Sequence, residues 1–469
     1  MELKKYKLGE ILDVTRGASL SGEFYATEGK YIRLTCGNFD YQNNCFKENK
    51  SKDNLYYIGD FKPEFLMEEG DIITPLTEQA IGLLGSTAII PESGKYIQSQ
   101  DVAKIICKEE LLDKDFVFYL ISSTLVKQQL SAAAQQTKIR HTSPDKIRDC
   151  TVWIPELTEQ KRIGKLLRSL DRKIELNRAI NQNLEAMAKQ LYDYWFVQFD
   201  FPNENGKPYK SSGGKMVWNE KLKREIPKGW NVLKLGEHCS FNKRTSNGYF
   251  NHPILYLDTS NITNNTIDEL QFLNPSSDII PSRARRLVQE GDIVYSTVRP
   301  NLKHFGIIMN PDYNMVVSTG FAVITANWSA YRYFIYQFLI QAATIENLST
   351  IAQSAVSAYP SINTSDIENL DLVVPPDSMI EKYAKTACRL YLQIDTNYKE
   401  IKSLTKQRDE LLPLLMNGQV SVNSDLAVSY IIYKNKIIRI MKENIIQAIV
   451  AKMQRDLDCR QMARLKAVL

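Results

Sequence analysis

Residues 156–196 of the chain read ELTEQKRIGKLLRSLDRKIELNRAINQNLEAMAKQLYDYWF. Apolar residues recur here at alternating steps of three and four, which returns them to one side of a helix every 3.5 residues on average. Pro155 lies just before the stretch, where a helix start tolerates proline. The stretch predicts a long helix that packs on a second helix along a seam of Gln160, Ile163, Leu167, Leu170, Ile174, Asn177, Asn181, Leu184, Ala188, Leu191 and Trp195.

The same seam recurs about 220 residues later in the chain. Its positions are Ile380, Tyr383, Ala387, Leu390, Ile394, Asn397, Ile401, Leu404, Arg408, Leu411 and Leu415. Five positions of the first seam carry the same residue type as the position 220 residues later. They are Leu170, Ile174, Asn177, Leu184 and Leu191. A shared heptad phase can arise by chance, but five identities at one offset indicate an internal duplication.

The duplication extends beyond the helices. The motif KLGE at residues 7–10 recurs at residues 234–237, and EGDI at residues 69–72 recurs as EGDI at residues 290–293. Short β-branched and aromatic runs, typical of strands, dominate both copies. The period is the size of a domain, which excludes a solenoid of short repeats. The predicted fold class is therefore α/β (of the α+β kind), with two homologous mixed domains separated by two long antiparallel coiled-coil helices.

The predicted organisation follows from these boundaries. It comprises a first mixed domain (1–155), a first long helix (156–199), a linker (200–229), a second mixed domain (230–375), a second long helix (376–417) and a basic tail (418–469). The linker is rich in Pro, Gly, Asn and Lys, so we expect a surface segment. A helix of about 36 residues is about 54 Å long. Asn177 and Asn397 are each sixth of eleven seam positions, so a centred antiparallel register predicts that their side chains meet.

Composition narrows the class of protein. Hydrophobic residues make up 43% of the 469 residues and charged residues 24%, as in globular proteins. We expect no membrane span, because no apolar run reaches about 18–20 residues, and no secretory leader. The seven cysteines contain no C-x-x-C pair, which indicates a reduced, cytoplasmic protein. Of the charges, nine basic and three acidic residues lie from Lys434 onward, which leaves 50 basic and 51 acidic residues elsewhere. Any nucleic-acid contact must therefore come from local clusters.

Catalytic signatures are absent from the sequence. It contains no G-x-x-x-x-G-K-[ST] or G-x-G-x-x-G phosphate loop, no H-E-x-x-H and no G-x-S-x-G. The four histidines, His141, His238, His252 and His304, are scattered. We therefore predict no catalytic residue and no metal site in this chain.

Basic clusters with short polar neighbours are the candidate DNA contacts. Arg and Lys neutralise phosphates; Arg can also donate two hydrogen bonds to guanine, and Asn can pair with adenine by donating to N7 and accepting from N6. A solvated face is the alternative for any single residue, whereas the clusters as groups favour DNA. The predicted contacts are Lys138, Arg140, His141, Lys146 and Arg148 in the first domain, and Arg283, Arg285, Arg286, Arg299, Asn301 and Lys303 in the second.

Several motifs, duplicated and in order, resemble one known family. They are KLGE, EEGDI with QEGDI, STVRPNLK, STGFAV, WIPELTEQKRI and SSGGKMVWNEKLKREIPKGW. Over residues 1 to about 420 the chain resembles the DNA-specificity subunit of a type I restriction–modification system. The start of the second helix departs from the pattern, because it lacks the Glu-Gln pair found at Glu159 and Gln160.

The resemblance implies a chain without catalysis of its own that reads a split double-stranded DNA target, one domain per half-site. Two methyltransferase subunits would dock on the paired helices, and motor-nuclease subunits would join them, around a single copy of this chain. S-adenosylmethionine, ATP and Mg would be held by those partners, and no cofactor by this chain. The target adenine would be flipped into a partner's pocket. By analogy with the family, the loops near Arg140 and Arg299 are the expected DNA contacts.

Two other functions are compatible with the sequence. The first is a divergent DNA methyltransferase or nuclease with its own active site, although VVPPDS at residues 373–378 lacks the polar and aromatic residues that flank Pro-Pro in an amino-methyltransferase site. The second is a coiled-coil adaptor without a DNA role. In the tail, residues from Met441 weakly resemble the start of site-specific tyrosine recombinases, and a basic helix without an essential role is the alternative.

Overall fold

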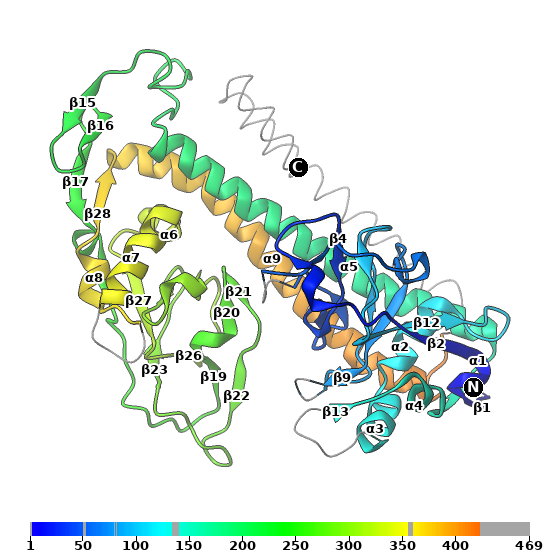
Figure 1. The fold of residues 1–469 in the computed structure, drawn as a ribbon. Helices are drawn as coiled ribbons and strands as arrows, with labels where there is room; N and C mark the ends of the chain where they lie inside the picture. The colour runs from blue at the N-terminus through cyan, green and yellow to red at the C-terminus, as the bar shows by residue number, and fades with distance from the viewer. Residues whose placement is uncertain are drawn as a thin grey trace. The chain divides into compact units, whose positions relative to one another are not determined.

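The computed structural model describes residues 2–49, 53–78, 80, 82–133, 140–354 and 360–422. These residues form two compact units, one with residues 2–176 and 401–422 and the other with residues 177–400. Each unit contains one mixed domain and parts of both long helices, α5 (Leu157–Tyr192) and α9 (Asp377–Met416) (Figure 1). The helices have 36 and 40 residues. The predicted α/β class with an internal repeat is confirmed.

The first domain is built on two four-stranded sheets. One is antiparallel, in the order β10 (Ala88–Ile89), β8 (Ile72–Pro75), β12 (Val102–Cys107) and β2 (Leu12–Arg16). The other has the order β11 (Tyr96–Ile97), β4 (Tyr31–Arg33), β7 (Tyr56–Tyr57) and β3 (Tyr25–Ala26). Strand pairs are β1 (Lys4–Lys7) with β14 (Thr151–Ile154), β9 (Thr77–Glu78) with β13 (Arg140–His141), and β5 (Phe39–Asp40) with β6 (Cys45–Phe46). The short helices are α1 (Leu8–Ile11), α2 (Lys114–Ile121), α3 (Thr124–Ala133) and α4 (Pro144–Arg148).

The second domain repeats this plan. Its antiparallel sheet has the order β18 (Cys239–Phe241), β27 (Phe321–Ala326), β24 (Ile293–Ser296) and β25 (Phe305–Ile307). The other sheet has the order β22 (Gln271–Leu273), β19 (Ile254–Leu257), β26 (Met315–Ser318) and β23 (Ala284–Leu287). Strand pairs are β17 (Asn231–Lys234) with β28 (Asp371–Val374), β20 (Ile262–Thr263) with β21 (Thr266–Ile267), and β15 (Met216–Asn219) with β16 (Arg224–Pro227). The short helices are α6 (Arg332–Leu339), α7 (Ala342–Ser354) and α8 (Thr364–Glu368).

The duplicated motifs have structural roles that explain their recurrence. In each EGDI motif the glycine adopts a positive φ, 85° at Gly70 and 80° at Gly291, which an L side chain rarely adopts. The following aspartate closes the turn, because Asp71 accepts the Glu68 N–H at 3.0 Å and Asp292 accepts the Gln289 N–H at 2.9 Å. The turn then leads into the buried strand β8 or β24. These motifs therefore shape the scaffold.

In the first unit, the helix pair is joined by a buried polar cluster. Arg408 of α9 donates to Asp171 of α5 at 2.9 Å, and their side chains are 7% and 10% exposed. Tyr119 of α2 donates its hydroxyl hydrogen to the other carboxylate oxygen of Asp171 at 2.5 Å. Next to this cluster, Leu170 and Ile174 pack against Leu404 in a small apolar core. The cluster therefore binds the first domain and both helices together.

In the second unit, the equivalent contact is different. Gln337 of α6 donates to the hydroxyl of Tyr391 on α9 at 2.8 Å, where the first unit has Tyr119 and Asp171. Glu185 of α5 accepts a hydrogen bond of 2.6 Å from Asn265, which follows β20. Burial raises the pKa of Glu185 to about 7, although the Asn265 amide favours the ionised form. At these two contacts the second domain therefore meets its helices through uncharged amide donors, one of which bonds a carboxyl group whose pKa is strongly raised.

The predicted meeting of Asn177 and Asn397 is wrong in register. Asn397 donates to the side-chain oxygen of Asn181 at 2.7 Å, and the Asn177 amide donates to Glu400 at 2.9 Å. Asn181 lies one helical turn beyond Asn177 on the same seam, so the antiparallel pair is displaced by that turn. The physical reason is that heptad phase fixes which face of each helix is buried but leaves its axial offset open.

The predicted seam residues lie largely inside the protein. Those that are buried are Ile163, Leu167, Leu170, Ile174, Asn177, Leu184, Leu191, Leu390, Ile394, Asn397 and Leu404. Ile401 and Leu411 are partly buried beside them. No helix within the described ranges is long and apolar enough to cross a membrane.

The segment expected to be a surface linker is partly buried. Phe201 stacks on Tyr209 and on Trp230, with ring centroids 4.6 and 5.2 Å apart. Phe201, Ile226 and Trp230 belong to the main hydrophobic core of the second unit. The prediction of a surface segment was wrong because it was based on the overall Pro, Gly and Lys content. That average does not show the few large apolar residues that pack beside the β15–β16 hairpin. Of the predicted tail, residues 423–469 lie outside the described residues.

Candidate nucleic-acid interface

The first domain presents a short two-stranded ladder after β8. Arg140 of β13 pairs with Glu78 of β9, and His141 pairs with Thr77. The Arg140 side chain is 40% exposed, and its Nη1 lies 3.5 Å from Glu78, whose side chain is only 6% exposed. His141 is exposed, with its Nδ1 3.3 Å from the Thr77 hydroxyl. Two of the predicted DNA contacts therefore lie next to each other on β13, whose partner strand β9 is buried.

The second domain presents the corresponding loop after β24. Arg299, Asn301 and Lys303 are all exposed. Arg299 and Lys303 have positive φ values of 48° and 59°, a region that non-glycine residues rarely occupy. The Arg299 N–H donates to the carbonyl of Pro360 at 3.0 Å, which fixes the loop to a neighbouring segment. Strained backbone of this kind concentrates at functional sites, so the loop is a candidate for contact with a ligand.

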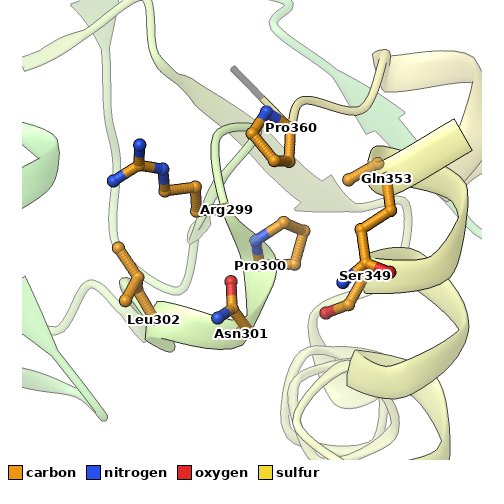
Figure 2. A pocket seen from close by; sticks show the side chains of 8 residues that line it. Arg299, Pro300, Asn301, Leu302, Ser349, Gln353 and Pro360 are labelled. Atoms are coloured by element: carbon orange, nitrogen blue, oxygen red, sulfur yellow. The ribbon is translucent and has the colours of Figure 1, made fainter. Parts of the chain in front are cut away.

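A pocket of about 300 Å³ lies beside this loop. Its lining comes from the loop and from α7, namely Arg299, Pro300, Asn301, Leu302, Ser349, Ala352, Gln353 and Pro360. In Figure 2 the side chains of Ser349 and Gln353 project from α7 on one side, and those of Arg299 and Leu302 lie on the opposite side of the loop. The pocket thus combines a guanidinium with two amide side chains, groups that can donate to phosphates and base edges.

A turn at residues 318–320 links the two predicted clusters of the second domain. The Thr319 N–H donates to the Arg283 carbonyl at 2.8 Å, and the Thr297 N–H donates to the Gly320 carbonyl at 2.9 Å. The backbone of Arg283 is thereby connected through this turn to the start of the Arg299 loop. The exposed Arg283 and the Arg299 loop therefore share one region of the domain.

Other predicted contacts are engaged within the protein. Arg148 pairs with Asp13 at 3.0 Å and with Asp145 at 2.7 Å, so its guanidinium fastens α4 to β2. Lys146 donates to the Ala133 carbonyl at 2.7 Å. Lys146 and Arg148 were grouped with Arg140 because they are close in sequence. In the fold, the guanidinium of Arg148 forms ion pairs with Asp13 and Asp145.

The three arginines at the start of β23 differ in exposure, and Arg283 lies just before that strand. Arg283 and Arg285 are exposed, whereas Arg286 is half-buried, and burial lowers its pKa. Arg285 donates to the Ser282 carbonyl at 2.9 Å. Arg286 therefore belongs to the interior side of the strand, and the arginine run contributes two exposed cations. Lys138 lies outside the described residues.

Glu78, Thr77 and Asp101 were not among the predicted site residues. The Thr77 hydroxyl donates to Asp101 at 3.4 Å, so the first ladder carries two carboxylates as well as Arg140. A direct comparison of the two duplicated loops shows the signal, because PLTEQA of the first copy stands where STVRPN stands in the second. Within the described part of the chain, no group of three His, Cys, Asp or Glu residues is arranged to hold a metal.

Comparison with known proteins shows the family. The model of the "Type I restriction modification DNA specificity domain" matches residues 1–186 and 227–406. The MjaIX specificity subunit of a type I restriction enzyme from Methanocaldococcus jannaschii is 25% identical, over 69% of this chain and 73% of that protein. The HindI specificity subunit of Haemophilus influenzae is 28% identical, over 36% of each.

A solved structure shares the fold. The type I restriction–modification S subunit from M. genitalium has a TM-score of 0.51 and 16% identity, and the match covers 89% of this chain and 96% of that one. The family model covers most of the chain in two blocks, one in each half of the duplication. The chain therefore belongs to the type I restriction–modification DNA specificity family.

Proposed function

We propose that this specificity subunit reads a two-part double-stranded DNA target, with one domain on each half-site. The observation that carries the proposal is that the DNA specificity domain occurs twice, on equivalent scaffolds whose exposed loops carry different side chains. Contacts to DNA phosphates position a protein on the duplex, whereas contacts of side chains to base edges specify the sequence. Two different loops on one scaffold therefore fit two different half-sites.

The Arg140 ladder and the Arg299 loop are the proposed DNA contacts of the two domains. The segments β9 and the Arg299 loop follow the equivalent strands β8 and β24; the Arg140 side chain paired with β9 is 40% exposed, and Arg299 is exposed. The pocket beside Arg299 adds Asn301 and Gln353, whose amides can bond an adenine edge. Each domain would thus recognise base edges with a different set of side chains.

The proposed partners are two methyltransferase subunits and motor-nuclease subunits, around one copy of this chain in the cytoplasm. Docking on α5 and α9 is supported by Leu176 and Leu392, which are large apolar residues exposed by 49% and 46%. S-adenosylmethionine, ATP and Mg are proposed to be held by the partners, and the chain to have no active site. The target adenine would be flipped into a methyltransferase pocket.

Mapping of N6-methyladenine tests this function. The chain would be expressed with its methyltransferase partner in a host that lacks this modification. We expect two short sequence blocks separated by a fixed number of unread base pairs, and no modification without the chain. An undivided target would contradict the proposal. Methyl transfer by the purified chain alone would indicate an active site of its own, and absence of DNA binding with the partner present would indicate an adaptor.

A further inference from the structure

The two recognition loops carry opposite charges at the same backbone position. Glu78 is the third residue after β8, and Arg299 is the third residue after β24. The same hydrogen bond holds each loop, from the Thr142 N–H to the Leu76 carbonyl at 2.9 Å and from the Ile362 N–H to the Thr297 carbonyl at 2.8 Å. The two positions are therefore equivalent, although one side chain is an acid and the other a base.

Glu78 is a buried carboxylate that is only partly satisfied. One of its oxygens accepts the Gly82 N–H at 2.9 Å. The other oxygen accepts no hydrogen bond from the described residues and lies 3.5 Å from Nη1 of Arg140. A buried carboxylate with unused acceptor capacity costs free energy unless a cation compensates it. A residue retained at such a cost is a candidate for a functional role.

Arg140 is held through one of its terminal nitrogens, and its side chain is 40% exposed. Its Nη1 faces Glu78 and also donates to the Ser131 hydroxyl at 2.9 Å. Neither Nε nor Nη2 of Arg140 donates a hydrogen bond to any residue within the described ranges. The guanidinium therefore presents an edge with two parallel N–H groups, which matches the O6 and N7 acceptors of guanine in the major groove.

We infer that Glu78 is a positioning residue, which orients Arg140 to read a guanine in the half-site of the first domain. This inference rests on the proposed function. In the second domain the arginine, Arg299, stands at the position equivalent to Glu78. Pro360 stands at the position equivalent to Arg140. Each domain thus places an arginine at an equivalent pair of segments, but the first domain has it on the second segment of the pair and the second domain has it on the first. Glu78 contacts no base, because its side chain is buried.

The test uses the full-length chain with its methyltransferase partner and compares Glu78→Gln, Arg140→Gln, Arg140→Lys and the double variant Glu78→Gln/Arg140→Gln. Rates of methylation are measured on duplexes that carry each base at every position of the mapped target. Arg140→Gln should lose about 5- to 150-fold of the preference for one guanine, the value of one bidentate contact. Glu78→Gln should relax the same position, and the double variant should be no worse than Arg140→Gln. Glu64→Gln is the control, because that side chain is 65% exposed.

Arg140→Lys separates positioning from folding. Lysine keeps a cation beside Glu78 but lacks the rigid pair of N–H groups, so it should lower the guanine preference while the melting temperature stays near that of the unmodified chain. Retained preference in Arg140→Lys would overturn the inference. So would unchanged specificity in Glu78→Gln, or a uniform loss on all sequences, which indicates a phosphate contact. The half-site of the second domain is the internal reference, since the variants should leave its specificity unchanged. If the proposed function fails, the chain without substitutions will also show no two-part target.

Discussion

Removal of Arg408 should strongly destabilise the first unit, because it leaves a buried carboxylate without its cation. The Arg408 and Asp171 side chains are 7% and 10% exposed and lie 2.9 Å apart. In Arg408→Ala the carboxylate of Asp171 stays buried and retains the Tyr119 hydroxyl as a donor. Loss of one partner of a buried pair costs about 3–5 kcal/mol, because the remaining charge is uncompensated. For a unit of this size, the melting temperature should fall by about 6–20 °C.

Differential scanning calorimetry measures this loss, and hydrogen exchange assigns it to residues 157–176 of α5. The control is Lys406→Ala, since the Lys406 and Glu410 side chains are 75% and 64% exposed and such pairs contribute about 0–1 kcal/mol. The double variant Asp171→Leu/Arg408→Met should recover most of the stability, because it removes both buried charges. A loss in Arg408→Ala no larger than in the control would refute the reasoning.

Three further changes test other parts of the fold. Glu185→Gln should increase the free energy of unfolding at pH 8 by at most about 3 kcal/mol and leave it nearly unchanged at pH 4.5, measured by urea titration; an equal effect at both pH values contradicts this. Asn397→Ala should cost about 1–3 kcal/mol, because Asn181 loses its 2.7 Å partner, measured as a lower melting temperature. Gly17→Ala should cost at least about 1–3 kcal/mol in the same assay, because its Cβ would lie 2.2 Å from a main-chain oxygen, whereas Gly22→Ala should be neutral.

The sign of the Glu185 effect follows from its pKa. Burial raises that pKa to about 7 in the folded chain, above the ordinary value of 4.5. The folded state therefore binds the proton more tightly than the unfolded state, and the contribution of this carboxyl group is lost as pH rises from about 4.5 to 7. Glutamine cannot ionise, so the variant should escape this loss.

The long helices and the duplication could be predicted from the sequence because both are periodic signals. Seam residues such as Leu170 and Leu390 recur at helical spacing, and the two copies repeat at one offset. The register could not be predicted, because Asn177, Asn181 and Asn397 occupy equally acceptable seam positions. The bonds of the structure select Asn181 for Asn397.

The candidate interface was predicted only in part. Arg140 and Arg299 stand out in sequence as cations in basic clusters, and both are accessible in the structure. Glu78 does not stand out, because its burial arises from a two-residue ladder with a strand about 60 positions away. The ion pair of Arg148 could not be predicted for a related reason: its carboxylate partner Asp13 is distant in the chain and adjacent only in the fold.

The different contacts between each domain and its helix have a consequence for gene rearrangement. The first domain holds the helix that follows it through Tyr119 and Asp171, and the second through Gln337 and Tyr391. A crossover at the domain boundary would place Tyr119 against a tyrosine and leave a buried carboxylate facing an amide. A crossover within the helix, beyond Asp171 or Tyr391, carries each matching pair along. The heritable module of target specificity in this chain is therefore a domain together with the first part of its helix.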